Sequence, residues 1–246
     1  ETKPYEECYF INTSFLGEEG IIPSVLNDLL KQRKATKKRM FNETDEFKKK
    51  LLDGLQLAYK VTANSVYGQL GAKTSSIFKK KIAACTTSIG RQRIEDARVG
   101  VIEWAKENNK GEPEIVYGDT DSVFVKFSRV KDGKTLEGKE ALEYCIQCGQ
   151  EAGKYVTDNF LEKPQDLEYE KTFYPFILIS KKRYTGDKYE DDPIKYKRTS
   201  MGIVLKRRDN APIVKYVFGN VIEKILIDRN FELAVQWLKD TLQEIR

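Results

Sequence analysis

The sequence contains no histidine in its 246 residues. Histidine is the side chain that titrates nearest neutral pH, and it is the commonest protein ligand for metals. Every mechanism that uses a histidine base or ligand from this chain is therefore excluded, and carboxylate, lysine, arginine and tyrosine chemistry remains. The four cysteines include one C-x-x-C, at Cys145 and Cys148, but no second pair or histidine completes a zinc site. We interpret these two cysteines as neighbours on a helix.

Long apolar runs and targeting signals are also missing. No stretch approaches the roughly 18 apolar residues of a membrane-spanning helix, and Glu1 is followed by charged residues rather than by a signal-peptide core. We expect a soluble, intracellular protein, with no distinction among nucleus, viral replication site and prokaryotic cytoplasm. The chain also lacks a Walker A sequence and a kinase glycine loop, so a glycine-rich turn does not hold phosphates here.

The residues that are present describe a globular protein with a mild basic excess. Hydrophobic residues make up 40% of the chain, and Lys+Arg 43 against Asp+Glu 38 gives a net charge of +5. Many of the basic residues cluster at 31–39, 79–81, 181–183 and 206–208. A surface for a polyanion would be assembled from these distant segments, whereas each cluster alone is better explained by a solvated face.

Hydrophobic periodicity predicts an α+β fold. An antiparallel pair of helices is expected first, over about 24 to 40 and from a cap at Thr44 to Gly68 or Gly71. The remaining expected elements are a helix over 80–108, a β-hairpin over 114–127, a helix over 141–160, two or three strands within 166–206, and helix from about Ala211 to the end.

The expected hairpin carries "YGDTDS" at its tip, with Asp119 and Asp121 two positions apart. In extended backbone their carboxylates project to the same side, where they repel each other unless a counter-charge is present. Hard oxygen ligands at a rigid tip suit Mg²⁺, which completes its octahedron with water and substrate phosphates. An ordinary Asx-type turn explains an isolated D-x-D pair equally well.

The second expected helix carries polar side chains on one narrow stripe. Its members, spaced at i, i+4, i+8 and i+11, are Gln56, Lys60, Asn64 and Tyr67. This mixture indicates a surface that meets a phosphate at one end and a base or sugar at the other. Arg33 and Lys37 are neighbours on the first helix, and the helical pair could bring them against Lys60. Cations for a triphosphate, with carboxylates for a divalent metal, indicate phosphoryl or nucleotidyl transfer.

Three motifs, "KVTANSVYG" (60–68), "YGDTDS" (117–122) and "KKRY" (181–184), occur in the order found in family B DNA polymerases, which the chain resembles over its whole length. The stretch "TANSVYGQLGAKTSSIFKKKIAACTTSIGR" is most similar to replicative polymerases of eukaryotes and large DNA viruses. The resemblance implies an antiparallel palm sheet with packed helices, a two-helix fingers hairpin and the beginning of a helical thumb. The implied parts are a palm entry segment at 1–20, fingers at 21–72, palm at 73–200 and start of the thumb at 201–246.

The resemblance implies a role for each matching residue. Asp121 would be the metal ligand and Asp119 an accessory carboxylate, with Glu170 as a further carboxylate, around two Mg²⁺ ions for which Mn²⁺ can substitute. Arg33, Lys37 and Lys60 would bind the incoming dNTP, with Asn64 and Tyr67 under the nascent base pair. The residues assigned to primer-template DNA are Gly68, Lys182, Arg183, Tyr184, Arg207 and Arg208, of which Lys182 and Tyr184 would touch the primer end in the minor groove.

The implied activity is that of a DNA-directed DNA polymerase (EC 2.7.7.7), in which a primer 3′-hydroxyl attacks the α-phosphate of a dNTP. The family carries another essential aspartate in a "D-x-x-S-L-Y-P-S" motif before the fingers, and this motif and the exonuclease domain are absent here. We therefore expect a fragment, a cleavage product or half of a divided polymerase, inactive until another polypeptide or upstream region supplies that aspartate.

Two alternatives from the residues remain open. A non-catalytic DNA-binding remnant could use the same basic surface as a scaffold, although an intact "YGDTDS" and Lys60 argue against it. Another palm-type nucleotidyltransferase, such as a cyclase or reverse transcriptase, would not be expected to carry "KVTANSVYG" on a helix of the fingers.

Overall fold

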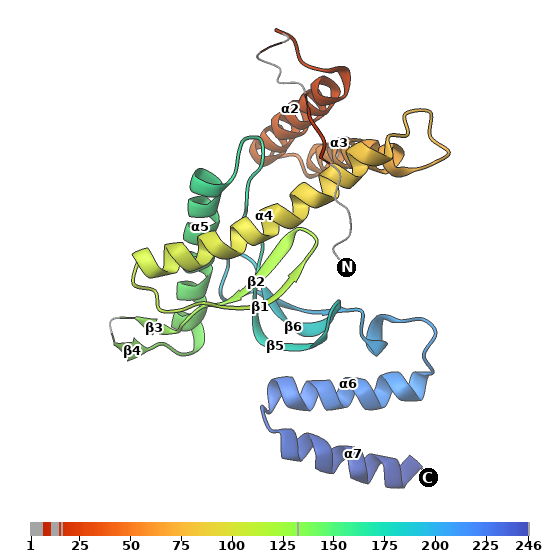
Figure 1. Ribbon diagram of the computed structural model, residues 1–246. Coiled ribbons are helices and arrows are strands. Elements are labelled where there is room, and N and C mark those ends of the chain that lie inside the picture. Colours follow the sequence, from red (N-terminus) through yellow and green to blue (C-terminus); the bar gives the residue numbers. More distant parts are fainter. Residues whose placement is uncertain (1–6, 11–14, 16, 132, 246) are drawn as a thin grey trace. The chain divides into compact units, whose positions relative to one another are not determined.

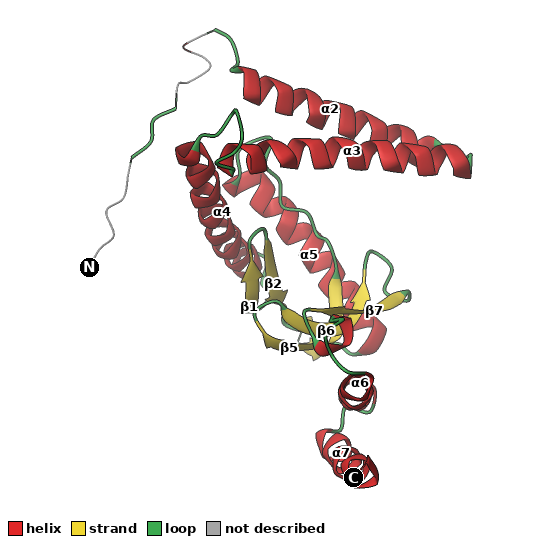
Figure 2. Ribbon diagram, turned by 90° about the vertical axis from the view of Figure 1, so that its right-hand side faces the viewer, coloured by secondary structure: helices red, strands yellow, loops and turns green. Residues whose placement is uncertain are grey.

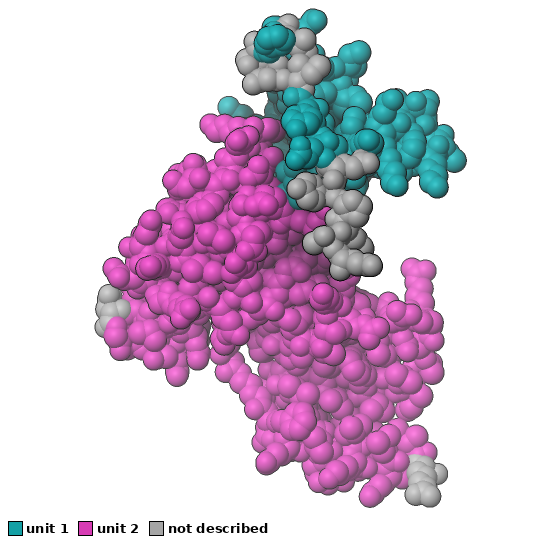
Figure 3. Space-filling model, in the orientation of Figure 1, with its two compact units in different colours: residues 1–89 teal, residues 90–246 magenta. Residues whose placement is uncertain are grey.

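The structure is a computed structural model that describes residues 7–10, 15, 17–131 and 133–245. The chain divides into two compact units, residues 1–89 and 90–246, coloured separately in Figure 3. Its helices and small antiparallel sheets confirm the predicted α+β class. Within the part of the chain that the structure describes, no helix is both long enough and apolar enough to cross a membrane.

The first unit is built around a helical hairpin. Helix α2 (Ile21–Asn42) is followed after a short connection by α3 (Glu46–Gly71), which runs back along it (Figure 2). The sequence placed the cap of α3 at Thr44, but this prediction is wrong by one residue. The Asp45 carboxylate instead accepts hydrogen bonds from the backbone N–H groups of Phe47 and Lys48, at 2.9 and 3.3 Å, because a cap satisfies N–H groups two and three positions ahead.

The second unit has its core between two helices. Helix α4 (Lys80–Glu107), which begins in the first unit, and α5 (Gly138–Phe160) pack together through apolar faces. A Cβ atom at Gly100 would lie 2.9 Å from both Val156 and Phe160, so glycine allows this close approach. The buried core residues are Ala97, Val101, Trp104, Ala105, Tyr144, Cys148, Ala152 and Val156. Cys145 and Cys148 both lie on α5, which confirms that they are helical neighbours.

The strands form three separate antiparallel sheets (Figure 1). The predicted hairpin is confirmed as β1 (Glu114–Asp119) paired with β2 (Ser122–Lys126). A second, very short pair is β3 (Val130–Lys131) with β4 (Lys134–Thr135). The third sheet has the order β5 (Thr172–Ser180), β6 (Arg183–Tyr189) and β7 (Tyr196–Met201).

The chain then continues through a 3₁₀ turn, η1 (Val204–Lys206), into α6 (Pro212–Ile227) and α7 (Phe231–Ile245). The sequence predicted one helix from Ala211 to the end, but the helix breaks at 228–230. Arg229 has a positive φ of 50°, and the Asn230 side chain accepts a hydrogen bond from the backbone N–H of Leu233 at 3.0 Å. Asn230 therefore caps a new helix.

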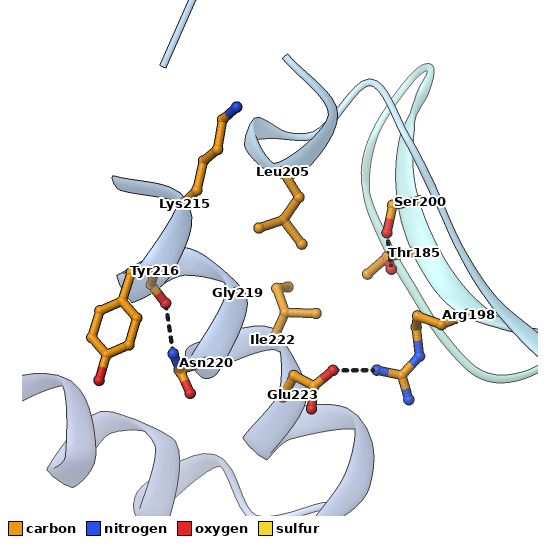
Figure 4. Close-up of a pocket in the computed structure, with 10 residues that line it drawn as sticks. All are labelled: Thr185, Arg198, Ser200, Leu205, Lys215, Tyr216, Gly219, Asn220, Ile222 and Glu223. Atoms are coloured by element: carbon orange, nitrogen blue, oxygen red, sulfur yellow. Dashed lines mark hydrogen bonds and ion pairs between the residues drawn. The ribbon is translucent and has the colours of Figure 1, made fainter. Parts of the chain in front are cut away.

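Helix α6 is joined to the sheet by an ion-pair network. Arg198 on β7 forks onto the mostly buried Asp187 of β6 and also contacts Glu223 of α6, with 3.3 Å between Nη1 and Oε1. These carboxylates, Asp187 foremost, raise the pKa of Arg198. Arg198 and Glu223 line a cavity of about 270 Å³ between sheet and helix, and Figure 4 shows the contact between them.

Candidate active site

The tip of the β1–β2 hairpin is a two-residue turn at Thr120 and Asp121. Asp119 pairs with Ser122, Thr120 adopts a positive φ of 53°, and the Asp121 N–H donates to the Asp119 carbonyl at 2.6 Å. Asp119 is half-buried at the end of β1, and Asp121 is exposed in the turn. Because Asp121 lies in the turn and not in extended backbone, the alternation of a strand does not set the direction of its carboxylate. Left-handed backbone at a β-branched residue is strained, and such strain is found mainly at functional turns.

The carboxylate of Asp119 is paired with the ammonium group of Lys182. The distance between Lys182 Nζ and Asp119 Oδ1 is 3.1 Å. This hydrogen bond is the main cause that holds the pKa of Asp119 below its ordinary value, and Thr120 and Tyr117 lower it further. The same contact raises the pKa of Lys182. The counter-charge that the crowded aspartates require is thus supplied in part by the "KKRY" motif, 63 positions further along the chain.

Lys182 lies in the tight turn between β5 and β6, again with a positive φ, of 62°. Its backbone N–H donates a hydrogen bond to the phenol oxygen of Tyr117 at 2.8 Å. On its other side, a Cβ atom at Gly202 would lie only 2.0 Å from the Lys182 carbonyl oxygen. The main chain of Lys182 is therefore hydrogen-bonded to Tyr117 on one side and closely approached by Gly202 on the other.

Tyr184 lies in an aromatic cluster beneath this turn. Its ring centroid is 5.5 Å from that of Phe124 and 6.5 Å from that of Tyr117, and the residue is only 5% exposed. Phe173 and Phe176 of β5 complete the cluster, so aromatic packing joins the hairpin to the β5–β6 pair. Burial is the main cause that raises the pKa of Tyr184. Contact of Tyr184 with a primer end stays a prediction, and its side chain offers little surface for it.

Glu170 lies just before β5, exposed and paired with its neighbour Lys171 at 2.8 Å. Among the described residues, no three acidic, cysteine or histidine side chains group closely enough to hold a metal ion. Glu170 is therefore not gathered with Asp119 and Asp121. The two aspartates present oxygen donors, the type that Mg²⁺ prefers, but they form only part of a ligand set.

The predicted DNA-binding arginines come from two segments of the second unit. Arg183 at the start of β6 and Arg207 after η1 both line one cavity of about 260 Å³. Arg207 also pairs with Asp209, with 2.7 Å between Nη2 and Oδ2, and this contact raises the pKa of Arg207. Arg208 is exposed beside it. The "KKRY" and "KRRD" segments thus lie close together in the fold.

The predicted nucleotide-binding residues lie in the first unit. Lys60, Asn64 and Tyr67 are exposed along one side of α3, and a Cβ atom at Gly68 would contact nothing within 4 Å. On α2, Lys37 is exposed, and the guanidinium of Arg33 donates to the Gln56 side chain of α3 at 3.3 Å. The helical hairpin therefore brings Arg33 to within one turn of Lys60 along α3.

Sequence reasoning missed Tyr117 and Gly202 as parts of this site. Tyr117 belongs to the "YGDTDS" motif, but its hydrogen bond reaches across 65 positions. The glycine after β7 indicates a strand end, and nothing local indicates that Lys182 is its neighbour. Both contacts depend on how separate strands pack, which no sequence pattern encodes directly.

The comparisons with known proteins all point to one family of polymerases. The model of a family described as DNA polymerase family B matches residues 6–246. A DNA polymerase of Pyramimonas orientalis virus is 42% identical, over 93% of this chain and 22% of that protein. DNA polymerase delta catalytic subunits of Candida albicans and Schizosaccharomyces pombe are 39% and 41% identical, over 99% and 92% of this chain and 22% and 20% of those proteins. The chain spans about a fifth of the length of these relatives.

Proposed function

Because the chain belongs to DNA polymerase family B, we propose that it takes part in template-directed DNA synthesis. The reaction is attack of a primer 3′-hydroxyl on the α-phosphate of a dNTP, with pyrophosphate as the leaving group. The activity is that of the complete polymerase, to which this chain contributes fingers, palm and the start of the thumb. We assign the fingers to 21–72, the palm to 73–200 and the thumb to 201–246, with residues 1–20 as entry to the palm.

The observation that carries this proposal is the ion pair between Lys182 and Asp119, at 3.1 Å. It places a cation from one motif on a carboxylate from another, at the exposed tip that also bears Asp121. A site with both charges can hold a metal on the carboxylates and an anionic primer end beside the lysine. An ordinary Asx-type turn has no need of a lysine from a distant strand.

Asp121 and Asp119 are the residues of this chain that would hold Mg²⁺, for which Mn²⁺ can substitute, whereas Glu170 lies apart from them and is paired with Lys171. When bound, Mg²⁺ supplies Lewis-acid chemistry that activates the primer hydroxyl and stabilises the leaving group. The chain's own residues orient the substrates. Lys182 contacts the primer end in the minor groove and Tyr184 supports its turn from beneath, while Gly68, Arg183, Arg207 and Arg208 bind the DNA backbone.

The incoming nucleotide is assigned to the first unit. Arg33, Lys37 and Lys60 bind the triphosphate, because their positive charges attract its phosphate groups. Asn64 and Tyr67, further along the same side of α3, lie under the nascent base pair. In this assignment the residues that bind the nucleotide differ from the residues that hold the metal. Mutations can therefore affect nucleotide binding and the chemical step separately.

The remaining aspartate comes from a segment with the "D-x-x-S-L-Y-P-S" motif, hereafter the missing palm segment, on the same or another polypeptide. Among the described residues, β1 and β2 form a sheet of two strands with no third strand paired to either edge. An unpaired strand edge presents backbone donors and acceptors to an incoming strand. The missing palm segment would pair there and bring its carboxylate to the hairpin tip.

The test is primer extension with Mg²⁺ and all four dNTPs, using the purified chain alone and with a second polypeptide carrying the missing palm segment. We expect no extension by the chain alone and extension when the partner is added. An Asp→Asn variant of the partner's motif serves as the matched control, since it should dock equally well without supplying the ligand.

Robust extension by residues 1–246 alone would refute the assignment of an incomplete site and make Glu170 the first suspect as the replacement ligand. If the partner docks and primer-template DNA binds, but no extension follows, the polymerase proposal fails and the scaffold alternative is favoured.

A further inference from the structure

Tyr117 lies at the centre of the contacts that join the two catalytic motifs. It precedes Asp119 by two positions on β1, so both side chains project from the same face of the strand. The Tyr117 hydroxyl accepts a hydrogen bond from the backbone N–H of Lys182 at 2.8 Å. The Lys182 ammonium contacts Asp119 at 3.1 Å. Strand β1 therefore contacts Lys182 twice, once through its backbone and once through its side chain.

The Tyr117 ring is itself fixed by packing. Its centroid is 5.3 Å from that of Phe124 on β2 and 6.5 Å from that of Tyr184 on β6. Both neighbours belong to the aromatic cluster between the hairpin and the β5–β6 pair. The phenol oxygen is thus presented from a ring with little freedom to move, and a phenylalanine would keep this packing while losing the hydrogen bond.

The turn that carries Lys182 needs such support. Lys182 adopts a left-handed backbone conformation, which side-chain-bearing residues rarely adopt without surrounding constraints. Its long side chain is 69% exposed, so packing does not fix the position of the ammonium group. What fixes the base of that side chain is the backbone, held by Tyr117 on one side and closely approached by Gly202 on the other.

We propose that Tyr117 is a positioning residue for nucleotidyl transfer: its phenol holds the backbone of Lys182 and so places the Lys182 ammonium at the Asp119 carboxylate and the primer end. This inference rests on the proposed function. The Lys182 N–H is at an exposed position, so water can replace the phenol when it is removed. Loss of the hydroxyl should therefore change the geometry of the site more than the stability of the fold.

The experiment compares Tyr117→Phe with Tyr155→Phe in the extension assay reconstituted with the missing palm segment. Tyr155 is the matched control, because it lies on α5 in the same unit and its hydroxyl interacts with Glu107 rather than with Lys182 or Asp119. One neutral hydrogen bond corresponds to roughly a three- to tenfold change in rate or equilibrium. We expect kcat/KM for nucleotide addition to fall by about that factor in Tyr117→Phe only, with affinity for primer-template DNA within about twofold of wild type.

Two further measurements separate positioning from a general structural role. If Tyr117 acts mainly through Lys182, Tyr117→Phe should have a clearly smaller effect in a Lys182→Ala background than in wild type; only the direct interaction of Tyr117 with Asp119 is left there. Hydrogen exchange of the Lys182 amide should be at least about threefold faster in Tyr117→Phe than in Tyr155→Phe, and this readout does not depend on activity.

The outcomes distinguish this proposal from the function on which it rests. Absence of extension by the wild-type pair refutes the proposed function and this inference with it. Extension by wild type with equal losses in Tyr117→Phe and Tyr155→Phe, full additivity with Lys182→Ala, or an unchanged Lys182 amide each overturns the role of Tyr117 and leaves the polymerase function standing.

Discussion

Replacing Gly202 by alanine tests how the turn of the "KKRY" motif is built. Gly202 follows β7 with a φ of +61°, and an added Cβ atom would lie 2.0 Å from the carbonyl oxygen of Lys182. Ordinary contact begins at 3.4 Å, so one of the two backbone segments must move by about 1.4 Å, from 3.4 minus 2.0. Because the obstructing atom belongs to the backbone, no side-chain rotation can relieve the contact.

The expected loss in the free energy of unfolding has two parts. A left-handed conformation costs an alanine roughly 1–2 kcal/mol, and a backbone shift forced by overpacking costs typically 1–3 kcal/mol more. Gly202→Ala should therefore lower the free energy of unfolding by about 2–5 kcal/mol. The matched control is Gly133→Ala, where φ is also positive, at +76°, but an added Cβ atom meets nothing within 4 Å. Only the first part applies there, about 1–2 kcal/mol.

The assay is urea denaturation of both variants and the wild type, followed by far-ultraviolet circular dichroism. Both glycines lie in the unit of residues 90–246, so the loss should appear in the transition of that unit. Gly202→Ala should also reduce extension in the reconstituted assay, since the shift displaces Lys182, while Gly133→Ala should not. Equal unfolding free energies for the two variants, within about 0.5 kcal/mol, would refute the reasoning that this close approach constrains the turn.

Three further predictions address the chemistry, the nucleotide and the thiols. With the missing palm segment present, Asp121→Asn should abolish extension while sparing DNA binding. A remaining rate above about a tenth of wild type would correspond to a loss of transition-state stabilisation under roughly 1.4 kcal/mol, and would show that Asp121 is not the metal ligand. Lys60→Ala should raise the KM for dNTP far more than the Kd for primer-template DNA, and equal losses in parallel titrations would mean that Lys60 contacts the template strand instead. Burial raises the pKa of the Cys145 thiol to about 11, so its thiolate fraction at pH 8 is about a hundredfold below that of an ordinary thiol and should rise tenfold per pH unit. Pulse labelling with iodoacetamide and peptide mapping should find Cys145 far slower than the exposed Cys8, and equal rates would contradict this.

The helices and the β1–β2 hairpin could be predicted because their signals are local. Apolar spacing in α2 to α5 and the turn residues of "YGDTDS" act over a few positions, and the structure has these elements close to the expected bounds. The errors are local as well. The α3 cap was predicted at Thr44 and lies at Asp45, because either side chain suits a cap. The break before α7 was missed because "DRN" contains neither glycine nor proline.

The site could be predicted only as separate motifs. "YGDTDS" and "KKRY" were recognisable in the sequence, but the pairing of Asp119 with Lys182 depends on the packing of β1–β2 against β5–β6. That packing is set by a cluster of aromatic rings from four strands, whose individual members look like ordinary core residues. The burial of Tyr184 follows from the same cluster, and its position directly after three exposed basic residues, 181–183, gave no sign of it.

The placement of the aromatic core has a spectroscopic consequence. The chain has two tryptophans, Trp104 and Trp237, and both belong to the unit of residues 90–246. Trp104 is 4% exposed and meets Phe127 edge-on at 5.9 Å in the α4–α5 core, while Trp237 on α7 lies 6.1 Å from Tyr216 of α6. Intrinsic fluorescence excited at the red edge of indole absorption therefore reports on this unit and is silent for the helical hairpin of residues 21–71. A Trp237→Phe variant would leave a single emitter inside the core, so the loosening of the terminal helices and the melting of the core become two separate optical signals.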